Sequence, residues 1–428
     1  MESKNDIMIL RTRDKIEQIR HGNVPEGYKK TKAGILPADW NVYILGDCLR
    51  RIERPVEVNP NELYTQIGIR SHGKGLFYKE PVTGEALGNK SVFWIEPNCF
   101  ILNIVFAWEQ AIGKTTQAEV GMIGSHRFPM YRPINDAVDI DYLISYFLTK
   151  RGTDILEAAS PGGAGRNKTL GQDRFLKSKI VLPPFKEQQK IAAILTAQDK
   201  IVELKENLLT EKQQQKKYLM QQLLTGKRRL PGFSGKWKSI KIGDFIKEID
   251  ERTTCNNQFK ILSVTRNGIV HQSVHFNKQI ASEDNTGYKV LRKGNLAFST
   301  MNLWMGSLDV LTICDVGIIS SAYKVFEFNK DLITIDFAIN YMKSAEMIWL
   351  YKMNSEQGAS IVRRNLDLHA LLSSKVSLPD LPEQTAIAEV LSTADRELDL
   401  LRQDIEQEKR KKKALMQLLL TGIVRVNV

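Results

Sequence analysis

The sequence has few of the residues that hold metal ions or disulfide frameworks. Its 428 residues include only six histidines and four cysteines, which are Cys48, Cys99, Cys255 and Cys314. The cysteines are too far apart for a zinc clip and too few for a disulfide-stabilised fold. Among the histidines only His271 and His275 are close, at a spacing more typical of a strand surface than of a ligand pair. We therefore expect reduced thiols and no bound metal.

Long apolar runs and catalytic motifs are also missing. No stretch approaches the roughly 20 apolar residues that span a bilayer, and residues 1–20 lack the apolar core of a signal peptide. We therefore expect a cytoplasmic protein. The Gly-Lys pairs at Gly113 and Gly226 lack the rest of a phosphate-binding loop. The segment Val181–Phe185 is similar to the Asn-Pro-Pro-Phe motif of amino-methyltransferases but lacks its amide. These absences indicate a binding protein and not a catalyst.

Positive charge is in excess. The chain has 61 lysines and arginines against 49 aspartates and glutamates, which gives a net charge of +12. An excess of this size favours a polyanionic partner such as nucleic acid. Charge alone fits a merely basic protein equally well, so the choice depends on the organisation of the chain.

An internal repeat organises the sequence. Residues 187–226 match residues 383–422 at 16 of 40 positions without a gap, at an offset of 196 residues. The two segments share a Glu-Gln pair near the start and a Leu-Leu-Thr-Gly sequence at the end. Upstream, Trp108 faces Trp304 at the same offset, and two Leu-Pro…Trp segments begin near Leu36 and Leu230. The chain is therefore built from two similar units in tandem.

Each unit is predicted to be an α/β domain followed by a long helix. Prolines precede the repeated segments, and Gly226 and Gly422 lie where a glycine ends a helix. We expect an N-terminal arm at 1–35, α/β domains at 36–183 and 230–379, long helices at 186–226 and 382–422, and a tail at 423–428. The predicted strands are 66–69, 91–95, 100–105, 260–264, 294–299 and 317–328, and the predicted short helices are 141–149 and 337–350.

The two long helices are predicted to form an antiparallel coiled coil. Each has seam residues at alternating spacings of three and four, with polar interruptions. A 40-residue helix is about 60 Å long at 1.5 Å per residue, so the pair would act as a spacer between the domains. The expected seam is Leu195, Gln198, Val202, Lys205, Leu209, Lys212, Lys216, Leu219 and Leu223 in one helix, and Leu391, Ala394, Leu398, Leu401, Ile405, Glu408, Lys412, Leu415 and Leu419 in the other.

Polar loops at matching places in the two domains favour DNA binding. Arginine and asparagine pair with guanine and adenine in the major groove, and phosphate contacts usually outnumber base contacts. An alternative is that these are ordinary solvated loops. The candidate DNA-binding residues in the first domain are Arg70, His72, Lys74, Ser125, Arg127, Arg166, Asn167 and Lys168. Those in the second domain are Arg266, Asn267, Asn302, Trp304, Ser321, Tyr323, Arg363, Arg364 and Asn365.

From about Val24 to Gly422 the chain resembles the specificity subunits of type I restriction-modification enzymes. The resemblance rests on the Leu-Pro…Trp entries, the Leu-Pro-then-Glu-Gln hinges, the Leu-Leu-Thr-Gly ends, and the segments Pro25–Tyr28, Arg229–Gly235 and Phe298–Trp304. It implies a mixed α/β fold: two target-recognition domains with mixed sheets, separated by an antiparallel coiled coil. Each domain would read one half of a split DNA site.

The resemblance also implies the partners of the chain. Double-stranded DNA, two methyltransferase subunits and restriction subunits would assemble with it. S-adenosylmethionine, ATP and Mg²⁺ would belong to those partners, and this chain would bind no cofactor and no metal. Two alternatives stay open: a stand-alone DNA-binding regulator, and the recognition fragment of a single-chain restriction-modification enzyme. The second would need methyltransferase or nuclease motifs that we do not find.

Overall fold

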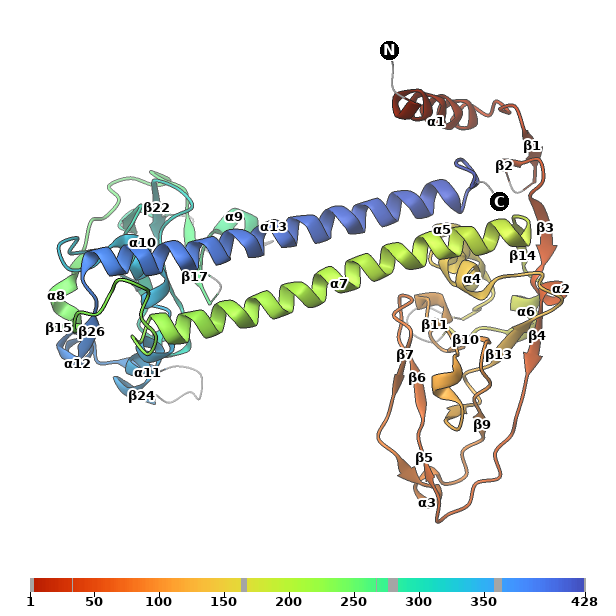
Figure 1. Cartoon of the computed structure of the whole chain (residues 1–428), viewed down its shortest axis with the longest axis horizontal. Coiled ribbons are helices and arrows are strands. Elements are labelled where there is room, and N and C mark those ends of the chain that lie inside the picture. Colours follow the sequence, from red (N-terminus) through yellow and green to blue (C-terminus); the bar gives the residue numbers. More distant parts are fainter. Residues whose placement is uncertain are drawn as a thin grey trace. The chain divides into compact units, whose positions relative to one another are not determined.

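The computed structural model describes residues 4–32, 34–162, 168–266, 268–275, 284–357 and 364–426. The chain divides into two compact units. The first unit comprises residues 1–205 and 404–428, and the second comprises residues 206–403. Two 39-residue helices, α7 (Phe185–Leu223) and α13 (Leu381–Leu419), contribute to both units (Figure 1). None of the described helices is long and apolar enough to cross a membrane.

A four-stranded antiparallel sheet forms the centre of the first α/β domain. Its order is β11-β10-β13-β4, from Ile112–Lys114, Phe100–Leu102, Met130–Pro133 and Leu49–Ile52. Five two-stranded pairs surround it: β1 (Tyr28–Thr31) with β2 (Gly34–Pro37), β3 (Asn41–Ile44) with β14 (Lys179–Leu182), β5 (Leu63–Tyr64) with β8 (Val82–Thr83), β6 (Ile67–Ile69) with β7 (Leu76–Tyr78), and β9 (Val92–Trp94) with β12 (Ile123–Ser125).

Short helices complete the first unit. Two of them, α4 (Ile140–Phe147) and α5 (Lys150–Ala158), begin after Asp139 and Thr149, whose side chains accept hydrogen bonds from backbone amides of the first turn. Such N-caps stabilise a helix start. The others are α1 (Lys4–Arg20), α2 (Leu45–Cys48), α3 (Gly84–Leu87), η1 (Ala107–Glu109), η2 (Gln117–Glu119) and α6 (Gln172–Leu176).

The second domain repeats the order of the four-stranded sheet but has four surrounding strand pairs in its described residues. Its sheet has the order β16-β23-β20-β21, from Ile246–Ile249, Tyr323–Phe328, Leu296–Ser299 and Leu308–Val310. The pairs are β15 (Lys238–Lys241) with β26 (Lys375–Leu378), β17 (Leu262–Thr265) with β18 (Gly268–His271), β19 (Lys289–Arg292) with β22 (Val316–Ile319), and β24 (Ser355–Gln357) with β25 (Arg364–Leu366). The helices are α8 (Ile242–Phe245), α9 (Gln272–His275), η3 (Leu303–Met305), α10 (Ile335–Tyr341), α11 (Ala345–Met353) and α12 (Leu368–Ser373).

The mixed α/β fold is confirmed, and three details differ from expectation. The described strand pairs are antiparallel, and parallel pairing is limited to two equivalent bridges, Gln66 with Ile123 and Ile261 with Ile318. The strand predicted at 317–328 is two strands, because the chain turns between β22 and β23. The helix predicted at 337–350 is also two helices, because Ser344 caps a new start at α11.

The long helices begin inside the hydrophobic cores of the domains that precede them. Ile191 and Leu195 near the start of α7 are buried in the first core, together with Leu419 and Leu420 from the end of α13. Equivalent residues of the second core come from the start of α13 and the end of α7: Ile387, Leu391, Leu223 and Leu224. Burial of these side chains fixes each helix to its domain, at about 25 cal/mol per Å² of apolar surface removed from water.

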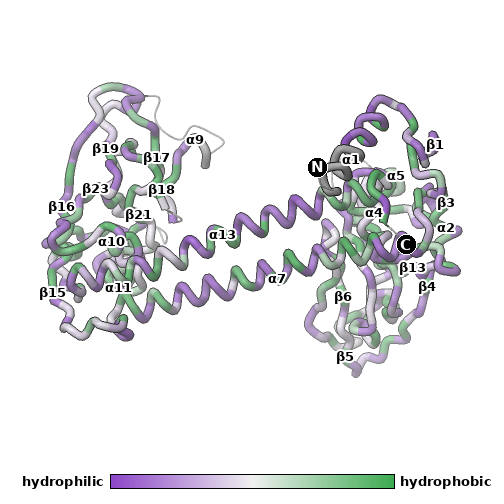
Figure 2. Tube along the Cα trace, turned by 45° about the horizontal axis from the view of Figure 1, so that its top comes forward, coloured by the Kyte–Doolittle hydropathy of each residue, from purple (hydrophilic) through white to green (hydrophobic). Residues whose placement is uncertain are grey.

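Within each unit the two helices run antiparallel, as predicted. Every expected seam residue is buried or half-buried, although both helices are mostly hydrophilic (Figure 2). The polar interruptions pair across the seam. In the first unit Lys205 lies 2.8 Å from Asp404, and Gln198 donates to Glu408 at 2.6 Å. In the second unit Lys212 lies 2.7 Å from Glu397.

Two further ion pairs are equivalent under the repeat, Lys412 with Asp199 and Lys216 with Asp395. Polar seam residues of this kind fix the register of a coiled coil. Both helices end at glycines in the left-handed conformation, Gly226 at φ 68° and Gly422 at φ 72°. This confirms the predicted C-caps, because a side chain would be strained there.

Candidate nucleic-acid interface

The loop between β6 and β7 contains three of the candidate residues. The backbone amides of His72 and Gly73 donate to the carbonyl oxygens of Glu109 and Gln110 at 2.8 and 2.9 Å, so the loop lies against η1. These bonds hold His72 at φ 61°, a conformation that is unfavourable outside glycine. Arg70 donates to the carbonyl of Leu76 at 2.6 Å. The side chains of Arg70, His72 and Lys74 are exposed.

Other candidates of the first domain gather around the segment that leads into η1. The amide of Ile104 donates to the carbonyl of Arg127 at 3.0 Å, and its carbonyl accepts from Leu170 at 2.8 Å. Lys168 lies over the indole ring of Trp108, 5.2 Å from its centroid. Ser125 has a turn role, because its hydroxyl accepts from the amide of Arg127 at 3.3 Å. Arg166 and Asn167 lie outside the described residues.

In the second domain an arginine, Arg364, occupies the position equivalent to Lys168. The guanidinium of Arg364 lies over the indole ring of Trp304, 4.5 Å from its centroid. Both residues are exactly 196 positions beyond Lys168 and Trp108, so the repeat has produced the same cation–indole pair twice. The Trp304 Nε1 and Arg364 Nε atoms are buried without a hydrogen-bond partner. Sequence comparison matched the two tryptophans but did not predict that a cation covers each of them.

The remaining candidates of the second domain lie near this pair or on the β17–β18 turn. Tyr323 is half-buried on β23 opposite Ser299, and burial raises the pKa of its hydroxyl, which stays a neutral donor at physiological pH. Asn302 precedes η3 and is half-buried, whereas Ser321 and Asn365 are exposed. Arg266 is exposed on the turn, beside Gly268. Asn267 and Arg363 lie outside the described residues.

A buried carboxylate at the start of α7 joins distant parts of the first unit, and its contacts were not predicted from the sequence. Glu187 is 1% exposed and accepts a hydrogen bond from Trp40 Nε1 at 3.1 Å. It also forms a bidentate ion pair with Arg425 at 2.6 and 2.7 Å. The guanidinium hydrogen bonds to Glu187 raise the pKa of Arg425. The segment predicted to be a tail is therefore fastened to the start of α7 and to the entry tryptophan.

The same arrangement closes the second unit. Glu383 is 1% exposed and accepts from Trp237 Nε1 at 3.1 Å and from Arg229 at 2.6 Å. Arg229 and Arg425 are 196 residues apart. The neighbouring glutamines bind the backbone of the α/β domains. Gln188 accepts a hydrogen bond from the amide of Asp139 at 2.9 Å, and Gln384 accepts one from the amide of Thr334 at 2.8 Å. The Glu-Gln motif thus joins the helix, the entry tryptophan and the domain.

The ion pair between Asp39 and Arg425 should make the stability of the first unit depend on pH. Its hydrogen bond from Arg425 lowers the pKa of the carboxyl group below the usual 3.8. A carboxyl with a depressed folded-state pKa stabilises the fold above its unfolded-state pKa, and the stabilisation is lost as the pH falls through the folded-state value. We expect Asp39→Asn to lower the thermal midpoint at neutral pH, and the difference from wild type to shrink as the pH falls below 3.8 and through the lowered folded-state pKa of Asp39. A difference that grows in acid would contradict this assignment.

No group of three or more histidine, cysteine, aspartate or glutamate side chains is arranged to hold a metal ion in the described parts of the chain. The divergent exposed loops around two equivalent cation–indole pairs are the candidate interface. Their two copies share a scaffold and differ in the side chains that they expose.

Comparison with known proteins identifies the family. The sequence profile described as type I restriction modification DNA specificity domain matches residues 81–213 and 234–409. A type I restriction enzyme MjaVIII specificity subunit from Methanocaldococcus jannaschii is 23% identical, over 94% of this chain and 96% of the relative.

Two solved structures share the fold over 91% of this chain. The HsdS subunit from Thermoanaerobacter tengcongensis has a TM-score of 0.52 and 17% identity, with 98% of its chain covered. A chain from a study of complex assembly and conformational transition of the type I R-M system has a TM-score of 0.58 and 18% identity, with 99% covered. Because the family profile spans most of both domains and of both long helices, the chain belongs to the type I restriction-modification DNA specificity family.

Proposed function

We propose that the chain is the non-catalytic DNA-recognition subunit of a type I restriction-modification complex, in which each α/β domain reads one half of a bipartite site. The observation that carries the proposal is the pair of equivalent cation–indole contacts, Lys168 over Trp108 and Arg364 over Trp304. Each is flanked by loops that differ between the two copies. A shared scaffold with different exposed side chains suits two readers of different sequences.

The proposed recognition set comprises all seventeen candidate residues, including the four that the structure does not describe. Exposed arginines such as Arg70 and Arg266 suit base edges or phosphates, and Lys168 suits a phosphate. We retain 36–183 and 230–379 as the recognition domains and 186–226 and 382–422 as the spacer helices.

The proposed partners are double-stranded DNA, two methyltransferase subunits and restriction subunits. S-adenosylmethionine, ATP and Mg²⁺ belong in this proposal to those partners, which carry out methylation and restriction when this chain has selected the site. A cytoplasmic location is part of the proposal, because the DNA substrate lies there. The rival reading as a stand-alone regulator predicts tight sequence-specific binding by the chain alone.

Methylation mapping tests the proposal. DNA from cells that express the chain with its methyltransferase subunit should carry methylated adenines in one bipartite motif. DNA from cells that express either protein alone should lack this pattern. Full sequence-specific binding by the purified chain alone would favour the regulator, and methylation by the chain alone would indicate an enzyme.

A further inference from the structure

The first α/β domain contains a strained residue at a place where the second domain has a glycine. Gln110 ends η1 in the left-handed conformation, with φ 59° and ψ 38°. Gly306, 196 positions later, ends η3 in the same conformation, with φ 82° and ψ 25°. Glycine adopts this conformation without steric cost, whereas a residue with a side chain is strained in it. The strain in the first domain therefore indicates a role for the Gln110 side chain.

The Gln110 side chain connects η1 with the junction of α4 and α5. Its amide nitrogen donates to the hydroxyl of Thr153 at 2.6 Å and lies 3.4 Å from the carbonyl oxygen of Phe147. The Thr153 hydroxyl donates in turn to the carbonyl of Thr149 at 2.9 Å, so it accepts from Gln110 and donates to its own helix. One glutamine thus joins the end of η1 to the first turn of α5.

The second domain shows that this junction folds without such a polar contact. Thr153 and Ile348 are equivalent, because each lies four residues after the N-cap of its helix. A β carbon added to Gly306 would lie 3.1 Å from Cδ1 of Ile348. A glycine and an apolar side chain therefore occupy the place of the Gln110–Thr153 hydrogen bond. The fold by itself does not explain the strained glutamine of the first domain.

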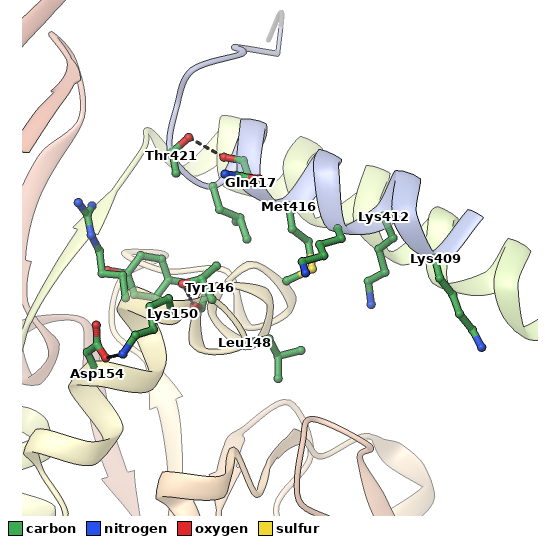
Figure 3. Close-up of a pocket in the computed structure, with 13 residues that line it drawn as sticks. Tyr146, Leu148, Lys150, Asp154, Lys409, Lys412, Met416, Gln417 and Thr421 are labelled. Carbon is green, nitrogen blue, oxygen red and sulfur yellow. Dashed lines mark hydrogen bonds and ion pairs between the residues drawn. The ribbon is translucent and has the colours of Figure 1, made fainter. Parts of the chain in front are cut away.

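The β6–β7 loop lies between the two elements that Gln110 connects. The amide of Gly73 donates to the carbonyl of Gln110 at 2.9 Å, and the hydroxyl of Ser71 donates to the carboxylate of Glu109 at 3.1 Å. Gly73 also lies against Leu148, because a β carbon at this glycine would be 2.5 Å from Cδ2 of the leucine. Figure 3 shows Leu148 at the junction of α4 and α5. Separation of η1 from this junction would therefore release the loop.

The equivalent loops of the two domains differ in their need for such a connection. Six positions, 70–75, separate β6 from β7, whereas two positions separate β17 from β18. The short turn is fixed by its own strand pair, and the amide of Ile269 beside it donates to Asp309 at 3.0 Å. Six residues lose more conformational freedom on ordering than two, so the longer loop needs more contacts to hold one conformation. The polar connection is present in the domain with the longer loop.

We propose that Gln110 is a positioning residue for recognition of the first half-site, which holds the β6–β7 loop through Thr153 and does not itself touch DNA. The loop presents the exposed side chains of Arg70, His72 and Lys74. This inference rests on the proposed function, because recognition of DNA by the loop is taken from it. It adds a residue that affects specificity without a contact to the DNA.

Two substitutions remove the contact from its two sides. Gln110→Gly removes the side chain and supplies a residue that suits the left-handed backbone, as Gly306 does in the second domain. Thr153→Val removes the acceptor hydroxyl with little change of shape, whereas Thr153→Ser retains a hydroxyl. Each full-length variant is expressed with the methyltransferase subunit. Methylation mapping gives the recognised motif, and titration with DNA gives the affinity of the purified complex.

We expect Gln110→Gly and Thr153→Val to relax the first half-site and to leave the second half-site unchanged. If the loop keeps its reading conformation in about a tenth of the molecules, affinity for the cognate site falls about 10-fold. The double variant should lose no more affinity than either single variant, because all three lack the same contact. Thr153→Ser should keep the wild-type motif. The valine and serine variants decide the question even where Gln110→Gly lowers the yield of folded chain.

The matched control is Asn98→Gly. Asn98 is exposed between β9 and β10 with φ 55°, so this variant also places a glycine at a left-handed position of the first unit. It should leave both half-sites unchanged. An unchanged first half-site in both Gln110→Gly and Thr153→Val would overturn the positioning role. Relaxation of both half-sites, or equal relaxation in the serine and valine variants, would also overturn it. A wild-type complex that methylates no bipartite motif would instead refute the proposed function, and this inference with it.

Discussion

Replacing Glu187 with alanine should lower the free energy of unfolding of the first unit by about 3 kcal/mol. Removal of one partner of a buried ion pair typically destabilises by 3–5 kcal/mol, because the other charge is left without its partner. Arg425 is 34% exposed and keeps Asp39 as a second partner, so the lower end of this range applies. Trp40 is 1% exposed and would also lose the acceptor for its indole nitrogen. An unsatisfied buried donor by itself costs about 1–3 kcal/mol, and the about 3 kcal/mol expected here includes this loss.

Hydrogen exchange read by mass spectrometry measures this effect separately in each unit. In Glu187→Ala, protection should fall in residues 36–183 and in the start of α7, while the second domain keeps its protection. Glu383→Ala should have the converse effect, because Glu383 joins Arg229 and Trp237 within the second unit. Glu203→Ala serves as a control, since its ion pair with Lys200 is exposed on both sides. Such pairs contribute about 0–1 kcal/mol.

Equal protection in Glu187→Ala and Glu203→Ala would show that the buried carboxylate does not hold the unit together. If Glu187→Ala lost hydrogen-exchange protection in both domains, the two units would not open independently. The Trp40→Phe variant separates the two contacts of Glu187. It removes the indole donor but leaves the ion pair with Arg425, so its effect should be smaller, at about 1 kcal/mol.

The long helices and their seam were predictable from the sequence. The buried contacts of Glu187 and Glu383, which join each helix to the domain before it, were not. Spacings of three and four residues placed the seam correctly, and the two cap glycines marked the helix ends within a few residues. These features are local, so a short window of sequence contains the whole signal. The contacts of Glu187 join residues 147 and 238 positions apart. No local pattern specifies such pairs, although the duplication of glutamate, tryptophan and arginine was visible.

The α/β domains were less predictable because their strands are short. Most of them have two to four residues, too few for an alternating pattern to define an end. The break between β22 and β23 is a tight turn at Ser320–Ala322, and this short polar interruption was read as part of one strand. The candidate loops were found by their position in the repeat. Their side chains were not predictable in detail, because a loop conformation depends on distant anchors such as the bonds from His72 and Gly73 to the residues of η1.

Replacing Arg266 with alanine should relax recognition of only one half-site. Arg266 is exposed on the β17–β18 turn, so its truncation should leave stability within about 0.5 kcal/mol of wild type. A bidentate contact to a base contributes about 1–3 kcal/mol of discrimination, which corresponds to a loss of roughly 5- to 150-fold at one base pair. Methylation mapping should therefore show one degenerate position in the half-site read by the second domain, and an unchanged first half-site.

The control for this variant is Lys330→Ala, which removes one exposed charge from the same unit outside the candidate loops. It should leave both half-sites unchanged. If Arg266 contacts a phosphate instead of a base, the variant should weaken binding to all sequences about equally and reduce the salt dependence by about one unit of slope. An unchanged motif together with unchanged affinity would remove Arg266 from the recognition set. Relaxation of both half-sites would contradict the assignment of one half-site to each domain, because Arg266 belongs to the second unit alone.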